Sequence, residues 1–257
     1  MKTVILAGGR GTRLAEETDV KPKPTVEIGG RPILWHIMKH YAHYGVGEFL
    51  IPVGYRGDLI RRYFLDYANI RSTVSVDLRS GQVERDDESV VEPWSVRLVE
   101  TGDDTQTGGR LLCLRRWLRD ETFFLTYGDG VSDVDLAQLL AFHRAHGRQA
   151  TVTAVRPPAR FGSLQLDGDQ VTAFTEKPER GEEWINGGFF ILEPGVFELL
   201  RGADDSLELD VMTQLAQLGE LRAFRHTGFW QCMDTLRDVR LLESLWHGEQ
   251  APWKVWS

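Results

Sequence analysis

The sequence predicts an α/β fold, in which helices cover both faces of a mainly parallel β-sheet. Two observations predict it. Strand-like and helix-like segments alternate along residues 1–149, which is the pattern that produces parallel sheets. Two of the expected strands end directly in glycine-rich turns, Gly-Gly at 8–9 and Gly-Asp-Gly at 128–130. Ligands of open α/β sheets bind beyond the carboxyl ends of the strands, so both turns are candidate parts of a site.

The elements of the first half follow from the spacing of their apolar residues. The β-branched run Thr3–Leu6 predicts the first strand, and the apolar positions of Pro32–Tyr44 recur at the spacing of a helix. The same reasoning predicts strands at Phe49–Val53 and Thr122–Tyr127, and helices at Asp58–Tyr67 and Val134–His146.

The pattern changes near Ala150 to short strands at turn-rich intervals. No linker separates the two parts, so we expect one domain, 1–257, with halves at 1–149 and 150–257 and a C-terminal helix and tail. The polar stretch from Ser72 to Glu92 is expected to form a solvated hairpin. The expected strands of the second half are Thr151–Val155, Gly162–Leu166, Gln170–Thr175 and Gly188–Leu192.

Composition and charge exclude several classes of protein. A chain of 257 residues with 42% hydrophobic residues suits a packed globular fold. The formal net charge of −8 argues against a nucleic-acid partner, because such binding neutralises phosphates with basic side chains. No window approaches the roughly 18 apolar residues of a membrane span, and no signal-peptide core is found. Cys113 and Cys232 are expected to be free thiols in a cytoplasmic protein.

The loop from Gly8 to Leu14 reads GGRGTRL, and its glycines would let backbone N–H groups approach a phosphate. A Walker P-loop requires Gly-Lys-Ser/Thr after four intervening residues, and a dinucleotide fingerprint requires a small residue where Leu14 stands. Because both patterns fail, neither an ATPase nor a dehydrogenase is favoured. The segment KPKP at 21–24 follows, where prolines restrict a loop that carries two lysines.

The start LAGGRGTRL followed by KPKP resembles the sugar-1-phosphate nucleotidyltransferases. The resemblance covers nearly the whole chain and implies a modified doubly wound, Rossmann-like sheet. Its further matching segments are TGGR (107–110), YGDG (127–130), EKP (176–178), NGGFF (186–190) and FWQCMDT (229–235). The segments EET (16–18), WHIMK (35–39), EPW (92–94) and APWK (251–254) are most similar to the members that join CTP to glucose 1-phosphate.

The resemblance implies that a sugar 1-phosphate attacks the α-phosphorus of a nucleoside triphosphate and that pyrophosphate leaves. Such a site must hold two anions together and stabilise charge, without a covalent nucleophile. Arg13 and Lys23 are the expected cations, and with Asp129 they form the expected catalytic set. Mg²⁺, for which Mn²⁺ could substitute, is the expected cofactor. Asp129 and Asp234 would hold it, because Mg²⁺ prefers carboxylate and phosphate oxygens.

The resemblance also implies contacts with the two small-molecule substrates. Glu176 would accept hydrogen bonds from the sugar, Lys177 would pair with its phosphate, and Asn186 with Gly187 would contact the ring. Backbone groups and the guanidinium of Arg110 could read the edge of a pyrimidine. The expected nucleotide-binding residues are Leu6, Ala7, Gly8, Gly9, Arg10, Gly11, Thr12, Arg13, Lys23, Gly108, Gly109, Arg110 and Gly128.

Two alternatives stay open. Arg10, Thr25 and Cys232 depart from the commonest residues at their positions, where an apolar residue, methionine and proline are usual. They leave the charged set intact but bear on substrate preference, so a dTTP- or UTP-dependent hexose-1-phosphate nucleotidyltransferase is one alternative. The other is a non-catalytic subunit that senses nucleotide sugars, although such proteins usually lose a lysine or aspartate that this chain retains.

Two groups of ring residues lead to further expectations. Trp253 and Trp256 in the tail suggest an intersubunit contact, and the resemblance implies a homo-oligomer, with a hexamer as one candidate. His36, His40 and His43 lie in one expected helix at spacings of four and three. A surface or packing role is expected for these histidines, with a metal site as the alternative.

Overall fold

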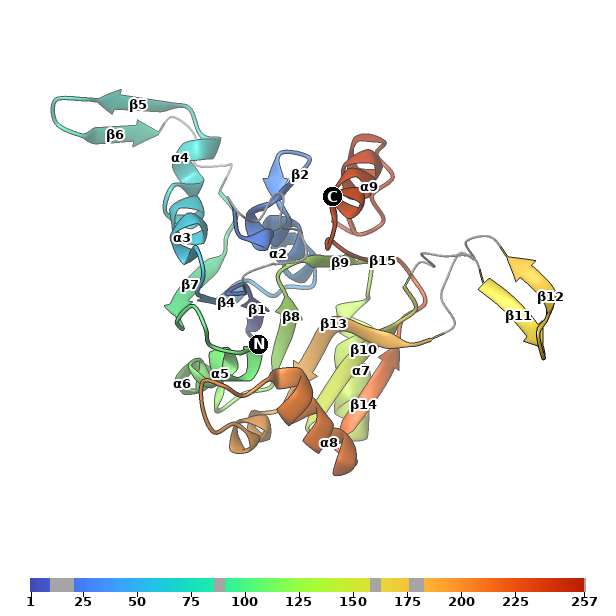
Figure 1. Cartoon of the computed structure of the whole chain (residues 1–257). Coiled ribbons are helices and arrows are strands. Elements are labelled where there is room, and N and C mark those ends of the chain that lie inside the picture. Colours follow the sequence, from blue (N-terminus) through green and yellow to red (C-terminus); the bar gives the residue numbers. More distant parts are fainter. Residues whose placement is uncertain (10–20, 86–90, 158–162, 176–182, 257) are drawn as a thin grey trace.

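The computed structural model describes residues 1–9, 21–85, 91–157, 163–175 and 183–256. Their central feature is a seven-stranded sheet, in which β1 lies between β8 and β4 (Figure 1). Across the sheet the strands are β14 (Leu221–Arg225), β10 (Ala150–Val155), β13 (Ile185–Leu192), β8 (Phe123–Tyr127), β1 (Thr3–Leu6), β4 (Glu48–Val53) and β7 (Ser95–Glu100).

The sheet is mainly parallel, as the sequence predicts. β1 pairs in parallel with β4 and with β8, so that Thr3 is opposite Phe49 on one side and Phe124 on the other. β7 extends this parallel set beyond β4, and β14 runs parallel to β10. β13 is antiparallel to both of its neighbours, β8 and β10. The carboxyl ends of β1 and β8 therefore lie at the same edge, where both glycine-rich turns begin.

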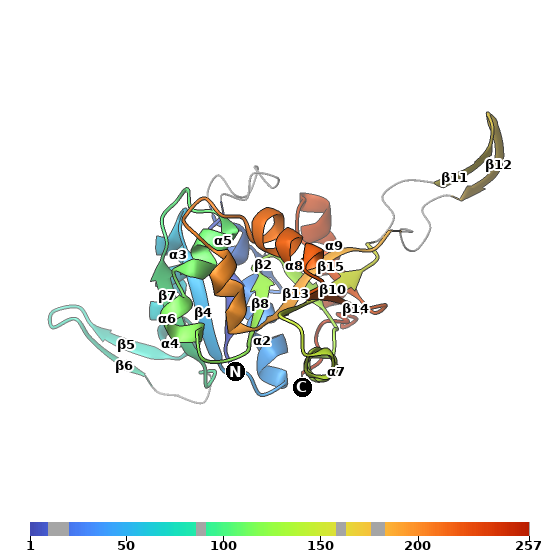
Figure 2. The same ribbon diagram turned by 90° about the horizontal axis from the view of Figure 1, so that it is seen from below.

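Helices cover both faces of the sheet, which confirms the predicted fold class (Figures 1 and 2). Alternate residues of a strand point to opposite faces, so Ile5 joins the core under α2 while Val4 joins a second core under α5 and α6. The helices are α2 (Ile33–His43), α3 (Gly57–Leu65), α4 (Tyr67–Arg71), α5 (Thr107–Leu112), α6 (Arg115–Leu118), α7 (Leu136–His146), α8 (Thr213–Gln217) and α9 (Leu236–His247). Shorter turns are the 3₁₀ segments η2 (Lys23–Thr25) and η3 (Pro194–Leu199) and the π-helix η4 (Leu207–Met212).

Two of the predicted boundaries differ in the structure, and local capping explains the first. The helix expected from Val134 begins at Leu136, because the side chain of Asp135 accepts hydrogen bonds from the backbone N–H groups of Ala137 and Gln138. The strand expected from Gly188 begins three residues earlier, at Ile185. Asn186 and Gly187 therefore lie on β13.

Four two-stranded ribbons complete the described structure. β5 (Val74–Asp77) and β6 (Gln82–Arg85) form a fully exposed hairpin, which confirms the expected solvated hairpin. This hairpin and the ribbon of β11 (Ser163–Asp167) with β12 (Gln170–Thr175) project from the body (Figures 1 and 2). The other two ribbons pair β2 (Glu27–Ile28) with β3 (Arg31–Pro32) and β9 (Gly130–Ser132) with β15 (Trp230–Cys232).

The tryptophans of the tail pack inside their own chain. Trp253 is 1% exposed and Trp256 is 9% exposed. The indole N–H of Trp253 donates to Nδ1 of His36 at 3.3 Å, and Trp256 packs edge-on against Trp35. The interpretation of these two tryptophans as an intersubunit contact is therefore wrong, because their surfaces are already used within the chain.

The predicted packing role of the helical histidines is confirmed for two of them. His36 and His40 are buried, and burial lowers the pKa of each to about 4. Nε2 of His36 is 2.8 Å from the carbonyl of Ile28, and Nε2 of His40 is 2.9 Å from that of Val134. Both rings are thus neutral core residues near pH 7.

Among the described helices, none combines the length and the apolar character needed to cross a membrane.

Candidate active site

A pocket of about 530 Å³ opens at the carboxyl ends of β1 and β8, which is a suitable size for a small-molecule ligand. It extends from the turn after β8 to the first turn of α5, and Asn186 on β13 forms part of its wall. Eleven of the predicted site residues line it: Leu6, Ala7, Gly8, Gly9, Lys23, Arg110, Gly128, Asp129, Asn186, Gly187 and Asp234.

Other predicted site residues are not placed in this pocket. Arg10, Gly11, Thr12, Arg13, Glu176 and Lys177 lie outside the described residues. Gly108 and Gly109 are buried on α5, where a Cβ on Gly109 would lie 2.4 Å from the carbonyl oxygen of Ala203. Their lack of a side chain thus has a packing reason. The contact of their backbone with a base stays a prediction.

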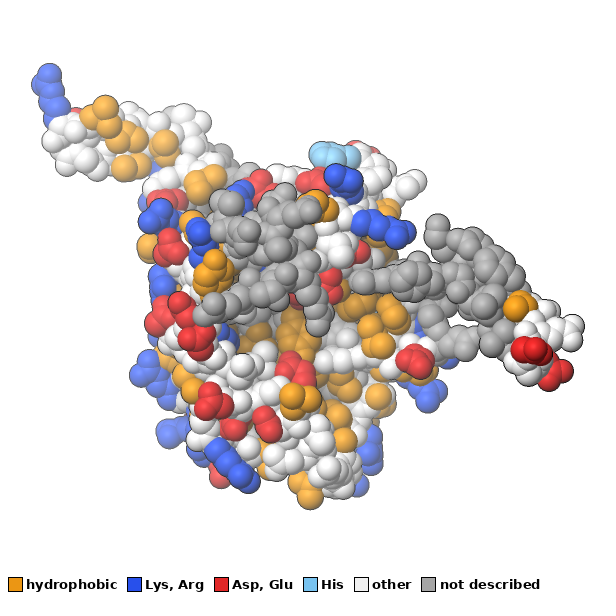
Figure 3. Space-filling view, viewed as in Figure 1, with side chains coloured by type: hydrophobic (Ala, Val, Ile, Leu, Met, Phe, Trp, Pro, Cys, Tyr) orange, Lys and Arg blue, Asp and Glu red, His pale blue; other side chains and the backbone are white. Residues whose placement is uncertain are grey.

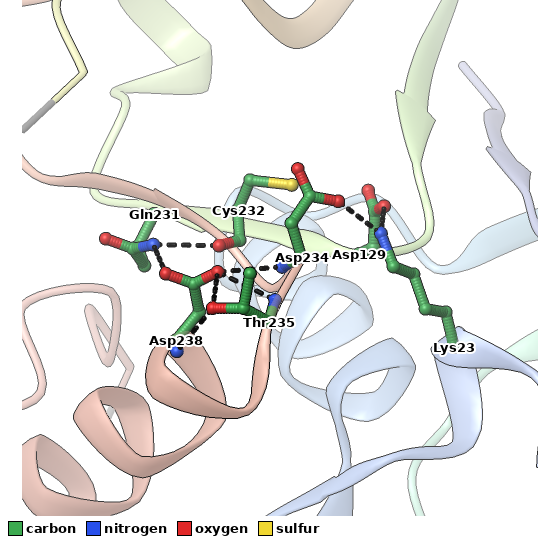
Figure 4. A network of polar contacts seen from close by, with 7 residues as sticks. All are labelled: Lys23, Asp129, Gln231, Cys232, Asp234, Thr235 and Asp238. Carbon is green, nitrogen blue, oxygen red and sulfur yellow. Dashed lines mark hydrogen bonds and ion pairs between the residues drawn. The ribbon is translucent and has the colours of Figure 1, made fainter. Parts of the chain in front are cut away.

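Lys23 connects two carboxylates that are distant in the sequence. Its ammonium nitrogen lies 2.9 Å from Oδ2 of Asp129 and 2.5 Å from Oδ1 of Asp234 (Figure 4). Burial acts to lower the pKa of Lys23, but the two carboxylates outweigh it and the pKa lies above its ordinary value. Lys23 is therefore charged at neutral pH, and its ammonium is the counter-ion of both aspartates.

Local structure fixes Lys23 at this position. Lys23 lies between Pro22 and Pro24 and is the first residue of the short turn η2. The N–H of Val26 closes the turn by donating to the Lys23 carbonyl. Proline fixes φ near −65° on both sides of the lysine. Pro24 also packs closely on the turn after β8, since a Cβ on Gly128 would lie 2.9 Å from its Cγ. The lysine is thereby held next to Asp129.

Asp234 reaches the pocket because the next residue caps the following helix. Thr235 is the N-cap of α9, and it forms a capping box with Asp238. A carboxylate oxygen of Asp238 accepts from the N–H groups of Asp234 at 3.1 Å and Thr235 at 2.8 Å (Figure 4). Thr235, and not Asp234, therefore caps the helix, and the Asp234 carboxylate is turned toward Lys23.

The backbones that carry the two aspartates are tied together. β9 pairs with β15 so that Gly130 is opposite Cys232, and the N–H of Met233 donates to the carbonyl of Asp129 at 2.8 Å. Two carboxylates in this arrangement are suitable oxygen ligands for a divalent cation of the Mg²⁺ type.

Cys232 adds a sulfur atom to the same group. One donor atom from each of Asp129, Cys232 and Asp234 lies within 4.8 Å of the other two. Burial raises the pKa of the Cys232 thiol, and the charges of the two aspartates raise it further. Both Cys232 and Cys113 are free thiols, as the sequence predicts.

Arg110 also lines the pocket. Its guanidinium donates to the hydroxyl of Thr101 at 2.6 Å and to the carbonyls of Gly102 at 2.9 Å and Asp103 at 3.1 Å. A Cβ on Gly8 would lie 2.2 Å from one of its nitrogens, so the first glycine turn packs directly on this side chain. Arg110 therefore fixes both the glycine turn and the loop that follows β7.

Sequence reasoning missed a polar network in which three pocket-lining residues, Thr107, Tyr127 and Asn186, connect to Glu208. The hydroxyl of Tyr127 donates to Glu208 at 2.6 Å, and the hydroxyl of Thr107 donates to the other oxygen of this carboxylate at 2.6 Å. The amide of Asn186 donates to the Tyr127 oxygen at 3.2 Å. Burial acts to raise the pKa of Glu208, but these hydrogen bonds lower it overall. Tyr127 adjoins the Gly-Asp-Gly turn, whereas no sequence pattern marks Glu208.

Comparisons with known proteins show which family the chain matches. The family described as nucleotidyl transferase matches residues 2–246. The chain is 52% identical to glucose-1-phosphate cytidylyltransferase of Salmonella typhi over 257 residues, and both chains are covered completely. It is 42% identical to the probable glucose-1-phosphate cytidylyltransferase of Bacillus subtilis, again over the whole of both chains.

Solved structures show the same fold at lower identity. HddC from Yersinia pseudotuberculosis is similar with a TM-score of 0.70 and 24% identity, covering 95% of this chain and 99% of that one. UDP-glucose pyrophosphorylase complexed with UDP-glucose is similar with a TM-score of 0.68 and 16% identity, covering 96% and 98%. At these identities the likeness concerns the fold.

Proposed function

This chain belongs to the nucleotidyl transferase family, and from this premise we propose that it transfers a cytidylyl group from CTP to α-D-glucose 1-phosphate. The products are CDP-glucose and pyrophosphate. The observation that carries the proposal is the 52% identity, over both full chains, to a glucose-1-phosphate cytidylyltransferase. The pocket supports it, because Lys23, Asp129 and Asp234 provide the charges that a phosphoryl centre requires.

The reaction is a direct displacement. A phosphate oxygen of glucose 1-phosphate forms a bond to the α-phosphorus of CTP, and the bond from that phosphorus to the bridging oxygen breaks. Pyrophosphate leaves with the electron pair. Negative charge grows around the α-phosphorus, so a fixed cation nearby lowers the barrier. Lys23 is the residue that we assign to this role, and Arg13 would bind the triphosphate beside it.

The α-phosphate and the two aspartates compete for the ammonium of Lys23. In the structure the ammonium neutralises Asp129 and Asp234, and it must turn away from them to reach a phosphate. The two carboxylates fit a divalent cation, which we propose is Mg²⁺, with Mn²⁺ as a substitute. When bound, the ion would neutralise phosphate charge and orient the reacting groups.

The two substrates would occupy opposite sides of the reacting phosphorus. We place the base near the Gly8 turn and Arg110, and the sugar near Asn186 and Gly187 with Glu176 and Lys177. Leu6, Ala7, Gly9 and Gly128 would present backbone groups to the nucleotide. Arg10, Gly11 and Thr12 belong to the same proposed loop, as do Gly108 and Gly109 at the start of α5.

CTP is expected to exceed UTP and dTTP by about tenfold or more in kcat/KM, because a wrong pyrimidine leaves a buried partner without its hydrogen bond. Arg110→Ala should erode this preference more than it lowers the rate with UTP. Steady-state kinetics with each triphosphate would measure both effects. Arg115→Ala is the matched control, since Arg115 is exposed and pairs with Glu198. An unchanged preference in Arg110→Ala would remove Arg110 from base recognition.

The alternatives differ from the proposal in defined ways. A dTTP- or UTP-dependent enzyme would share the reaction but not the base preference. A sensing subunit would bind nucleotide sugars without turnover. Lys23, Asp129 and Asp234 are all retained and converge in the pocket, which supports catalysis over sensing, because non-catalytic subunits usually lose a lysine or aspartate of this set.

We also propose that the protein is a cytoplasmic homo-oligomer, for which a hexamer is one candidate. The β5–β6 hairpin supports an assembly, because it carries exposed apolar side chains such as Val76 and Leu78 (Figure 3). An isolated two-stranded hairpin is marginal in water, so a partner surface would stabilise it. Light scattering should give a multiple of the 29.2 kDa chain mass. A mass equal to one chain would contradict the proposal.

A further inference from the structure

Cys232 places a sulfur donor beside the carboxylates that face Lys23. The donor atoms of Asp129, Cys232 and Asp234 lie within 4.8 Å of one another, and all three side chains are partly buried in the same pocket wall. The sulfur of Cys232 points toward the Asp234 carboxylate (Figure 4). In the part of the chain that the structure describes, no other trio of His, Cys, Asp or Glu donors converges in this way.

This donor set exceeds what Mg²⁺ can use. Mg²⁺ is a hard cation that binds oxygen, so the sulfur does not help to hold it. Thiolate selects softer or borderline ions, among which Zn²⁺ binds mixed sulfur and carboxylate sets. We propose that Asp129, Cys232 and Asp234 form a binding site for a thiophilic divalent cation of the Zn²⁺ class. Such an ion would compete with Mg²⁺ for the two carboxylates, and only this competition rests on the proposed function.

The geometry requires a small adjustment. In a tetrahedral Zn²⁺ site with metal–sulfur and metal–oxygen distances of about 2.3 and 2.1 Å, neighbouring donors are about 3.4–3.6 Å apart. The donors here lie within 4.8 Å of one another, so they must approach by at most about 1.4 Å. The backbone needs no change, because the β9–β15 pairing already holds Gly130 opposite Cys232.

A cation already occupies this point of the pocket. The ammonium of Lys23 lies within hydrogen-bonding distance of both carboxylates, which shows that their arrangement suits a positive charge. A bound ion would replace the ammonium, and Lys23 would turn toward the open pocket. Asp129 and Asp234 would supply one oxygen each, and water or a phosphate oxygen would complete the tetrahedron.

Binding through sulfur releases a proton. The thiol loses its proton to solvent as the metal–sulfur bond forms, and the oxidation states of the metal and the sulfur stay unchanged. The cation also reverses the local electrostatics, because it replaces repulsion between thiolate and carboxylates by attraction. Cys232 and the two aspartates then become ligands of the same ion.

Cobalt provides a direct probe of the sulfur ligand, because Co²⁺ bound to thiolate has a sulfur-to-metal charge-transfer band in the near ultraviolet. The full chain, without nucleotide, would be titrated with Co²⁺ and then with Zn²⁺ to displace it. The wild type should show the band, and Cys232→Ser should lose it. Cys113→Ser is the matched control and should keep the band, because Cys113 is exposed and lies outside the pocket lining.

Zinc affinity gives the second measurement. Competition with a chelating dye should show Zn²⁺ binding to Cys232→Ser about tenfold or more weakly than to the wild type, with circular dichroism confirming the fold. Asp234→Asn should weaken both the cobalt band and the zinc affinity. Equal spectra and affinities in the wild type and Cys232→Ser would overturn the proposal. These readouts need no turnover, so an inactive protein with the band would contradict only the proposed function.

Discussion

Lys23→Ala is expected to lower turnover by about two orders of magnitude or more while leaving the fold intact. The substitution removes the cation that we assign to the α-phosphate, and loss of one preorganised electrostatic contact typically has an effect of this size. It also leaves Asp129 and Asp234 without their shared counter-ion. Pyrophosphate release under steady-state conditions would measure the rate, and circular dichroism would verify the fold.

The variant has a matched control outside the pocket lining. Lys39→Ala removes an ammonium that pairs with Glu92 and does not line the pocket, so this variant should retain the wild-type rate. A second outcome separates catalysis from simple disruption. Because Lys23 competes with cations for the two carboxylates, Lys23→Ala should bind Mn²⁺ more tightly than the wild type in the absence of nucleotide. Near-normal turnover in Lys23→Ala would remove this residue from the mechanism.

Asp129→Asn and Asp234→Asn should each raise the Mg²⁺ concentration needed for half-maximal activity by about tenfold or more, since each removes one anionic oxygen ligand. The amide keeps the size of the side chain, so the packing of the turn after β8 and the capping of α9 should survive. A Mg²⁺ titration of the rate would measure the effect. Asp204→Asn, at an exposed position outside the pocket lining, is the control.

Two results would contradict this metal assignment. The first is a wild-type rate in excess EDTA, because no divalent cation would then be required. The second is an unchanged Mg²⁺ dependence in both aspartate variants. A shift in only one variant would keep the cation but reassign the other carboxylate to holding Lys23.

The sheet could be predicted from the sequence because its strands are locally marked. Thr3–Leu6 is short and β-branched, it is buried on both faces, and a glycine turn follows it directly. Strands that are buried on both faces can be predicted because they appear in the sequence as continuous apolar runs. The first residue of the antiparallel strand β13 is harder to predict, because Asn186 and Gly187 resemble loop residues although they lie on the strand.

The convergence of the charged residues could not be derived from local pattern. Lys23 and Asp234 are 211 positions apart, and only the pairing of β9 with β15 and the capping of α9 bring them together. The resemblance to a family supplied what periodicity could not. The burial of Trp253 cannot be predicted from the sequence for a related reason, since tertiary contacts with α2 and α9 decide whether a tail is exposed.

Glu208 and Cys232 are two residues whose contacts in the pocket region could not be predicted from the sequence. Glu208 stands in a π-helix, and its role in joining Tyr127 to Thr107 depends on contacts across 81 and 101 positions. Cys232 was visible only as a departure from the usual residue. Its meaning as a metal donor emerges from the distances to Asp129 and Asp234.

The central claim is tested most directly by pyrophosphate release over a matrix of the four nucleoside triphosphates and several sugar 1-phosphates. The account predicts the highest kcat/KM for CTP with glucose 1-phosphate, about tenfold or more above UTP and dTTP with the same sugar. Equal efficiency with CTP and dTTP would contradict the base assignment and keep the reaction class. No pyrophosphate release from any pair would contradict the reaction itself.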